Sequence, residues 1–215
     1  MRETKLRNPP LDCISPIGQE QILAGLKANV EADLYECITR SPSVYRGIPF
    51  LVEAAVAYGG SLPGDKQARL MRFANRVPLL YQTGGCVITQ SVQSLNWRQY
   101  GVDQPTGSLP VGPMVLFVHV ASPWVPFTSE SKEAVADYPE IAREVTLALQ
   151  ECARKLRIYL SRRRRHTEEM RKRQYIEKYI PHIGDALQEI LSFSNSEKGR
   201  LVERLTETLE RSRGG

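Results

Sequence analysis

The apolar run MVLFVHVAS, at residues 114–122, is the feature that most limits how this chain can fold. A near-continuous run of this kind is typical of a strand that is buried on both faces in the middle of a sheet. His119 lies inside the run, and we expect it to be a buried, hydrogen-bonded histidine of the core rather than a metal ligand. The run therefore predicts a sheet with this segment as its central strand.

Three earlier segments also have the composition of strands, at residues 34–40, 47–58 and 68–81. They are rich in β-branched and aromatic residues, and Gly, Pro, Ser and Asp separate them. In the third segment, apolar and polar side chains alternate from Leu70 to Leu79, which predicts a single half-exposed strand. Glu53, an acid inside the second segment, is expected to be a surface or salt-bridged residue.

Two short helices are predicted around these strands. Ser15 and Pro16 have the residue types of a helix cap and a first helical position, so a helix should run from there to about Val30. Residues 86–97, CVITQSVQSLNW, should form a second helix of about three turns.

A long helix is predicted after the central strand. Apolar residues recur every three or four positions from Ile141 to Tyr159, and helix-forming residues extend the pattern over residues 133–179, before Pro181. At 1.5 Å per residue this helix would be roughly 70 Å long. Because its apolar stripe fades after Leu160, we expect its distal part to project from the domain or to pack on another one.

The order of helix, three strands, helix, strand and long helix predicts an α+β fold, in which a sheet packs against helices. Beyond Pro181, the amphipathic residues HIGDALQEILSF suit a partner groove or a helical hairpin. The tail that follows ends in Gly-Gly and is expected to fray.

The positive charge of the chain is concentrated in one segment. The chain has 29 Lys and Arg against 24 Asp and Glu, and residues 154–173 hold ten of these bases and only two of the acids. The rest of the chain is therefore slightly acidic. A polyanion is expected to bind the basic segment, which contains the run Arg162, Arg163, Arg164 and Arg165.

Several function classes find no support in the sequence. There is no P-loop, GxGxxG, GxSxG or HExxH motif. The four cysteines are far apart and form no CxxC pair, which argues against a zinc site and fits a reducing cytoplasm. No apolar run is long enough to span a membrane, and the N-terminus does not resemble a signal peptide. We assign no catalytic and no metal-binding residue, and expect no chemistry from this chain alone.

Lys132 lies where a hydroxyl-rich loop meets the predicted long helix, in VPFTSESKEAVADYPEI. A helix dipole favours anions, not cations, at its N-terminal end. Lys132 is therefore either an ordinary solvated side chain or a ligand for an anion that is not part of this chain.

Five motifs of the chain, in this order, resemble the transducer region of the B subunit of archaeal-type topoisomerase VI, a type IIB DNA topoisomerase. They are PLDCISPIGQEQILAGL, PSVYRGIPFLVEAAVAYGG, RFANRVPLLYQTGGCVITQSV, NWRQYGV and VHVASPWVPFTSESKEAVADYPEI. The resemblance runs from about Leu11 to Leu160 and continues more weakly to about Leu191. It implies an S5 domain 2-like fold, named after a ribosomal protein, with three strands, a helix, a strand and a long projecting C-terminal helix.

The resemblance also implies a division of the chain. Residues 1–32 would be the end of a preceding region with the leading helix, and residues 33–160 the S5-like transducer domain. Residues 161–180 would be a projecting basic stalk helix, and residues 181–215 a C-terminal helical segment with its tail. The ATPase domain of the family, which is of the histidine-kinase-like (GHKL) type, would precede residue 1.

Site residues follow from the resemblance as well. Lys132 occupies the position of a lysine that, in this family, reaches the γ-phosphate of ATP in the ATPase domain. Trp97, Arg98 and Tyr100 match a motif associated with DNA contact, which usually reads W-K-x-Y. Arginine in place of lysine keeps the charge and still suits phosphate. The alternative is that this tryptophan and tyrosine simply pack on the sheet.

The implied function is to couple ATP binding and hydrolysis to double-strand DNA cleavage and strand passage by the A subunit. Implied partners are the A subunit, a second B subunit and double-stranded DNA, with no membrane, in a cytoplasmic, nucleoid-associated protein. ATP and Mg²⁺ would act in the complete subunit, and neither would be bound by this chain alone. Two alternatives remain: a stand-alone nucleic-acid-binding protein with an S5-like fold and an Arg-rich helix, and a ribosome-associated or small-molecule kinase relative. The kinase should carry a Gly/Ser-rich phosphate loop, and the sequence has none.

Overall fold

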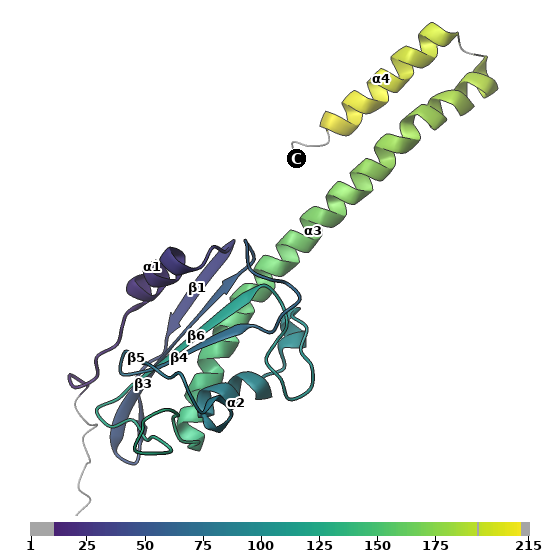
Figure 1. Ribbon diagram of the computed structural model, residues 1–215. Helices are drawn as coiled ribbons and strands as arrows, with labels where there is room; N and C mark the ends of the chain where they lie inside the picture. Colours follow the sequence, from purple (N-terminus) through teal and green to yellow (C-terminus); the bar gives the residue numbers. More distant parts are fainter. Residues whose placement is uncertain (1–10, 193, 212–215) are drawn as a thin grey trace, which may run out of the picture. The chain divides into compact units, whose positions relative to one another are not determined.

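The computed structural model describes residues 11–192 and 194–211 of the chain (Figure 1). The chain divides into two compact units, Met1–Leu160 and Ser161–Gly215. The first unit is built on a sheet, and the second is helical.

The sheet of the first unit has six strands. Five of them lie in the order β1-β3-β6-β4-β5, and β2 pairs with the first three residues of β3. All neighbours are antiparallel except β4 and β6, which are parallel and are connected through a helix. The strands are β1 (Leu34–Thr39), β2 (Ser43–Tyr45), β3 (Ile48–Tyr58), β4 (Arg69–Ala74), β5 (Val77–Pro78) and β6 (Met114–Ala121).

The predicted central strand is confirmed. Every residue of β6 is buried, and β6 lies between β3 and β4. Strand β3 is buried over nearly its whole length as well. Such burial needs a layer on each face of the sheet, which explains why both strands read as apolar runs rather than as alternating ones.

Helices supply these layers (Figure 1). On one face, α2 (Val87–Ser94) and the first part of α3 (Pro139–Leu191) cover the even-numbered residues of β3 and β6, such as Val52 and Leu116. On the other face, α1 (Gln19–Asn29) covers odd-numbered ones such as Ala55 and Val115. The predicted α+β class is confirmed, and the predicted elements follow one another in the expected order, with β2 and β5 as additional short strands.

The first helix begins later than the sequence suggests. It starts at Gln19 rather than at Ser15, and Gly18 precedes it with a backbone φ of +94°, a conformation that favours glycine. The N–H groups of Ile17 and Gly18 are occupied by the carboxylate of Glu53, each over 2.8 Å. These bonds hold the chain out of the helix until Gln19.

The third predicted strand is in fact a hairpin. Strand β4 ends at Ala74, the chain turns at Asn75 and Arg76, and the short strand β5 returns antiparallel to it. Both turn residues have left-handed backbone angles, with φ of +46° and +68°. The predicted single strand over residues 68–81 is wrong because this turn contains no glycine to mark it.

The long helix is also displaced at both ends. α3 begins at Pro139 rather than at residue 133 and continues through Pro181 to Leu191. The tail that was expected to fray forms a further helix, α4 (Asn195–Arg211), and its last residues, 212–215, lie outside the described part of the chain. Whether residues 161–180 project as a stalk stays a prediction.

In the second unit, α4 packs against the end of α3. A Cβ on Gly184 would lie 2.8 Å from a methyl group of Val202, so the two helices meet where glycine leaves room. Lys198 pairs with Asp185, and Gln188 donates to Asn195 over 2.7 Å. This pairing is the helical hairpin that the amphipathic pattern allowed. None of the helices in the described residues could cross a membrane.

Candidate functional site

The loop that carries Lys132, residues 122–138, joins β6 to α3 and is called the Lys132 loop below. It is anchored in the core by the buried side chains of Val125 and Val135. Phe127 and Val135 form an isolated antiparallel bridge, and the N–H of Val87, at the start of α2, donates to the carbonyl of Val135 over 3.0 Å. These backbone contacts hold the loop at its base.

Lys132 lies at the tip of this loop. Its own N–H donates to the carbonyl of Ser129 over 3.2 Å, and outside that turn the N–H of Thr128 donates to Ala134 over 2.9 Å. Several residues separate Lys132 from Pro139, where α3 begins. The expected position at the first turn of a helix is therefore wrong: Lys132 belongs to a closed turn.

The backbone of Lys132 is strained. Its φ is +55°, in the left-handed region that costs a residue with a Cβ about 1–2 kcal/mol. The side chain is exposed, and within residues 11–192 and 194–211 it makes no ion pair. Strain of this kind clusters at sites where the local conformation serves a function. A cation is thus held outward with no internal partner.

A cavity of about 450 Å³ lies beside the tip of the loop. Lys132, Glu130 and Ser129 contribute polar groups to its lining, and Trp124 and Phe127 contribute aromatic ones. Trp124 is 71% exposed, which is unusual for the largest apolar side chain. The cavity combines one cation, one carboxylate and an exposed aromatic ring, so its lining is not uniformly positive.

The residues matched to the DNA-contact motif form the 3-10 helix η2 (Trp97–Tyr100). Trp97 is 0% exposed, and its indole N–H donates to the carbonyl of Val92 over 2.8 Å. Tyr100 is buried as well, whereas Arg98 is exposed. The alternative in which the two aromatic residues pack in the core therefore describes them, and Arg98 is the member of this motif that faces solvent.

The arginine run lies in the second unit, on α3. All four side chains of Arg162, Arg163, Arg164 and Arg165 are exposed. Successive residues of an α-helix point about 100° apart, so four in a row surround the helix instead of forming one face. The geometry suits non-specific attraction to a polyanion better than a shaped binding site.

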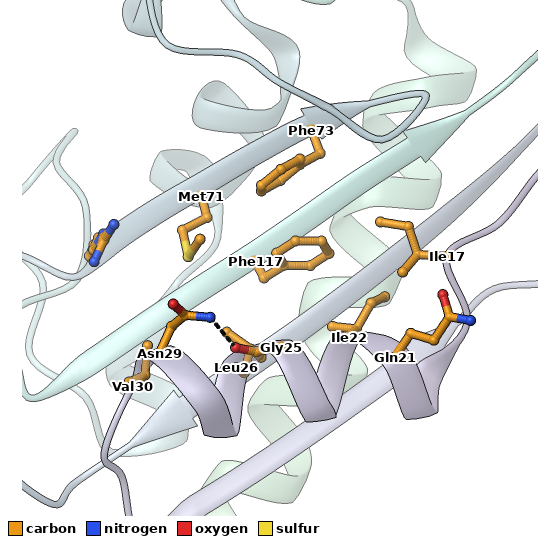
Figure 2. Close-up of a pocket in the computed structure, with 11 residues that line it drawn as sticks. Ile17, Gln21, Ile22, Gly25, Leu26, Asn29, Val30, Met71, Phe73 and Phe117 are labelled. Carbon is orange, nitrogen blue, oxygen red and sulfur yellow. Dashed lines mark hydrogen bonds between the residues drawn. The ribbon is translucent and has the colours of Figure 1, made fainter.

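A second cavity, of about 410 Å³, lies between α1 and the sheet (Figure 2). Its lining is mainly apolar, and the side chains of Met71, Phe73 and Phe117 face α1 across it. The polar groups of the lining, on Gln21, Asn29 and Arg69, include no acid and no thiol. Its lining therefore holds no carboxylate or thiol that could act as a general base or a nucleophile.

Two of the cysteines are poor nucleophiles for a physical reason. Burial raises the pKa of Cys37 to about 12, and burial raises the pKa of Cys152 well above its ordinary value too. A thiol that is protonated at neutral pH does not act as a nucleophile or a metal ligand.

Sequence reasoning missed one buried polar cluster. Glu53 and His119 are both 0% exposed, and Glu53 Oε2 lies 2.8 Å from His119 Nδ1. The surface position considered for Glu53 is wrong, and its partner is His119 through a hydrogen bond. The buried, hydrogen-bonded role of His119 is confirmed. An acid and a histidine, each inside an apolar strand run, were the available signal, but 66 residues separate them.

The fold and the site together define an α+β domain in which a loop with an exposed lysine follows the central strand. A long helix follows this loop. Residues 9–172 match the family model of the topoisomerase VI B subunit transducer. The B subunit of type 2 DNA topoisomerase 6 from Methanosarcina acetivorans is 50% identical over 190 residues, 88% of this chain and 31% of that protein. Its counterpart from Archaeoglobus fulgidus is 45% identical over 204 residues, 95% of this chain and 34% of that protein.

The chain belongs to the topoisomerase VI B subunit transducer family. It spans about a third of the length of these two relatives. A crystal structure of the B subunit of DNA gyrase from Myxococcus xanthus covers 63% of this chain and 38% of that one, at 19% identity and a TM-score of 0.40, which is a weak similarity.

Proposed function

We propose that this chain is the transducer part of an ATP-dependent type IIB DNA topoisomerase B subunit. It would couple ATP binding and hydrolysis in an adjoining domain to double-strand DNA cleavage and strand passage by an A subunit. The observation that carries the proposal is the presentation of Lys132, an exposed cation held at a strained turn with no partner among the described residues. Family membership supports the same reading.

Lys132 is proposed to contact the γ-phosphate of ATP that another domain binds together with Mg²⁺. A charge-assisted contact of this kind contributes about 1.5–3 kcal/mol. This amount changes an equilibrium by roughly 10- to 150-fold, which is enough to bias the chain between nucleotide states. The Lys132 loop offers a single cation, and the sequence has no phosphate-binding loop, so the chain would sense the nucleotide and not hold it.

Contacts with DNA are proposed for the exposed arginines. Arg98 would reach phosphate from the first unit, and Trp97 and Tyr100 would hold its backbone from the core. The run 162–165 would add attraction to the backbone of double-stranded DNA, independent of sequence. This would place the protein in the cytoplasm, associated with the nucleoid.

Docking on the A subunit is proposed for the second unit. Exposed apolar side chains there include Tyr175, Ile183 and Ile190. A helix pair that leaves such side chains uncovered suits a protein partner. A second B subunit would join in the ATP-dependent dimer, and this chain alone should neither hydrolyse ATP nor cleave DNA.

The test is a B subunit that carries this chain as its transducer, reconstituted with an A subunit. Lys132→Ala should reduce ATP turnover and strand passage by roughly 10- to 150-fold, while Lys132→Arg, which keeps the charge, should lose much less. Unchanged turnover of Lys132→Ala at saturating ATP would refute the sensor role. Tight DNA binding by the isolated chain without any binding to the A subunit would favour the stand-alone nucleic-acid-binding protein instead.

A further inference from the structure

The turn between β4 and β5 holds the base of the Lys132 loop. Asn75 pairs with Ser122, the residue that follows β6, through two reciprocal hydrogen bonds: its Nδ2 donates to the carbonyl over 2.8 Å, and its Oδ1 accepts from the N–H over 2.9 Å. The N–H of Asn75 also donates to Val120 over 2.9 Å. Ser122, in turn, accepts from the N–H of Trp124 through its hydroxyl oxygen.

The next residue of the same turn holds the segment that leads into α1. The guanidinium of Arg76 donates to the carbonyl of Pro16 over 2.8 Å. Its backbone N–H donates to Nε2 of His119 over 3.0 Å. The turn therefore contacts the Lys132 loop through one residue and the leading segment through the next.

The buried pair of His119 and Glu53 connects this turn to the leading segment. Nε2 of His119 accepts a hydrogen bond from the N–H of Arg76, so the hydrogen of the ring is on Nδ1. This Nδ1–H donates a hydrogen bond to the carboxylate of Glu53. Glu53 then accepts the N–H groups of Ile17 and Gly18, over 2.8 Å each, and the hydroxyl of Thr39 over 3.3 Å. A path of hydrogen bonds, with one covalent step from Arg76 to Asn75, thus runs from the leading segment, through the sheet, to the base of the Lys132 loop.

We propose that Asn75, Arg76, His119 and Glu53 are positioning residues for Lys132, because they bind the leading segment 15–18 and the base of the Lys132 loop into one hydrogen-bonded unit. A displacement of the leading segment is thereby transmitted to the loop that presents the cation. The functional part of this statement rests on the proposed contact of Lys132 with an anion, and the coupling itself does not.

Two properties support the coupling, the burial of the Glu53–His119 pair and the left-handed turn that carries the exposed Asn75 and Arg76. Glu53 and His119 are fully buried, so water cannot replace a hydrogen-bond partner of either side chain. A partner that moves away therefore leaves a polar group unpaired in the core. Asn75 and Arg76 both occupy left-handed backbone angles, which few alternative turns reproduce. Segments joined in this way move together or break several bonds at once.

Hydrogen exchange in the chain as it stands tests the coupling without ATP. The reporters are the amides of Gly18, in the leading segment, and Thr128, in the loop. Asn75→Gly keeps the left-handed backbone and removes only the side-chain bonds. It should speed exchange by up to about tenfold at Gly18 as well as at Thr128, since the loss of a partly buried hydrogen bond has at most about this effect on an equilibrium.

The second half of the test changes the other end of the connection, at Glu53. Glu53→Gln should speed exchange at Thr128 as well as at Gly18, because coupling between two sites is reciprocal. Asn75→Asp keeps the acceptor for the N–H of Ser122, so it should restore part of the protection and serve where Asn75→Gly folds poorly. Ser192→Gly, at a left-handed position of the second unit, is the matched control and should change neither reporter.

Changes confined to the mutated side in both arms would overturn the proposal. Normal ATP turnover of Lys132→Ala would instead refute the anion contact and leave the exchange result standing, so the two failures are distinguishable. Acceleration at the opposite reporter in both arms, with buried amides of β3 unaffected, supports the coupling.

Discussion

The carboxylate of Glu53 and Nδ1 of His119 lie 2.8 Å apart in the middle of the sheet, with no exposed surface on either side chain. Burial by itself would raise the pKa of Glu53, but hydrogen bonds from His119 and from the N–H groups of Ile17 and Gly18 outweigh it and hold this pKa below its ordinary value. Glu53 is therefore the structural anion of the first unit.

Glu53→Gln is expected to destabilise the first unit by about 1–3 kcal/mol at pH 7, because an amide offers one acceptor oxygen where a carboxylate offers two, leaving a buried N–H unpaired. Urea unfolding would measure it. The control is Glu36→Gln, which removes a half-exposed ion pair with Lys155 and should cost less than about 1 kcal/mol. Equal losses for the two variants would contradict the buried-anion account.

Acid should act through the same residue. Since the folded-state pKa of Glu53 lies below its unfolded value, its contribution is fully present above the unfolded pKa and is lost as the pH falls through the folded one. The free energy of unfolding should therefore fall below about pH 4.5. The fall should be shallower in Glu53→Gln. An identical acid dependence in both proteins would exclude Glu53 as its source.

The strained turn at Lys132 gives a prediction that separates stability from function. Lys132→Gly should be more stable than Lys132→Ala by about 1 kcal/mol, because glycine adopts a φ of +55° without the penalty of a Cβ. ATP turnover should be equally reduced in both. Glu130, in the same loop, is not at a left-handed angle, so Glu130→Gly should be no more stable than Glu130→Ala.

The arginine run predicts a salt dependence. If the residues 162–165 contact phosphates, the logarithm of DNA affinity should fall against the logarithm of salt concentration with a slope of about −0.9 per contact. Replacing all four with glutamine should flatten this slope by a few units. An unchanged slope, together with loss of binding to the A subunit, would make the run a protein-docking surface.

A stiff α3 is required if the helix transmits motion between the two units. Glycine at both Ser161 and Arg162 should cost about 2 kcal/mol of helix propensity and leave the first unit folded, since Leu156 stays in its core. In the reconstituted enzyme, DNA cleavage should then uncouple from ATP hydrolysis. Alanine at both positions, which also removes the arginine, is the control. Normal coupling in the glycine variant would reduce the helix to a tether.

The sequence predicted the elements whose patterns are set by burial. β6 is apolar throughout because it is covered on both faces, and the stripe from Ile141 to Tyr159 repeats because α3 lies on the sheet. The Lys132 loop was located by the motif around it. Its strain was not, because a left-handed lysine leaves no mark in composition.

The error at the first helix arises because local chemistry is satisfied by a distant residue. Ser15 and Pro16 have the look of a helix start, yet the carboxylate that caps this segment comes from β3. The tail contained an overlooked local signal. Ser194 and Glu197 form a capping box, in which the N–H of Ser194 donates to the Glu197 carboxylate over 2.9 Å.

Pro181 interrupts the backbone hydrogen bonding of α3 near the C-terminal end of the helix. A proline has no N–H to donate to the carbonyl four residues before it. The carbonyl of Glu177 therefore lacks its helical hydrogen bond, and a helix would ordinarily end near this point. α4 packs on the turns that follow Pro181, at Gly184, Asp185 and Gln188. A chain without α4 is therefore expected to lose helix in the last turns of α3, beyond Pro181, before it loses helix elsewhere.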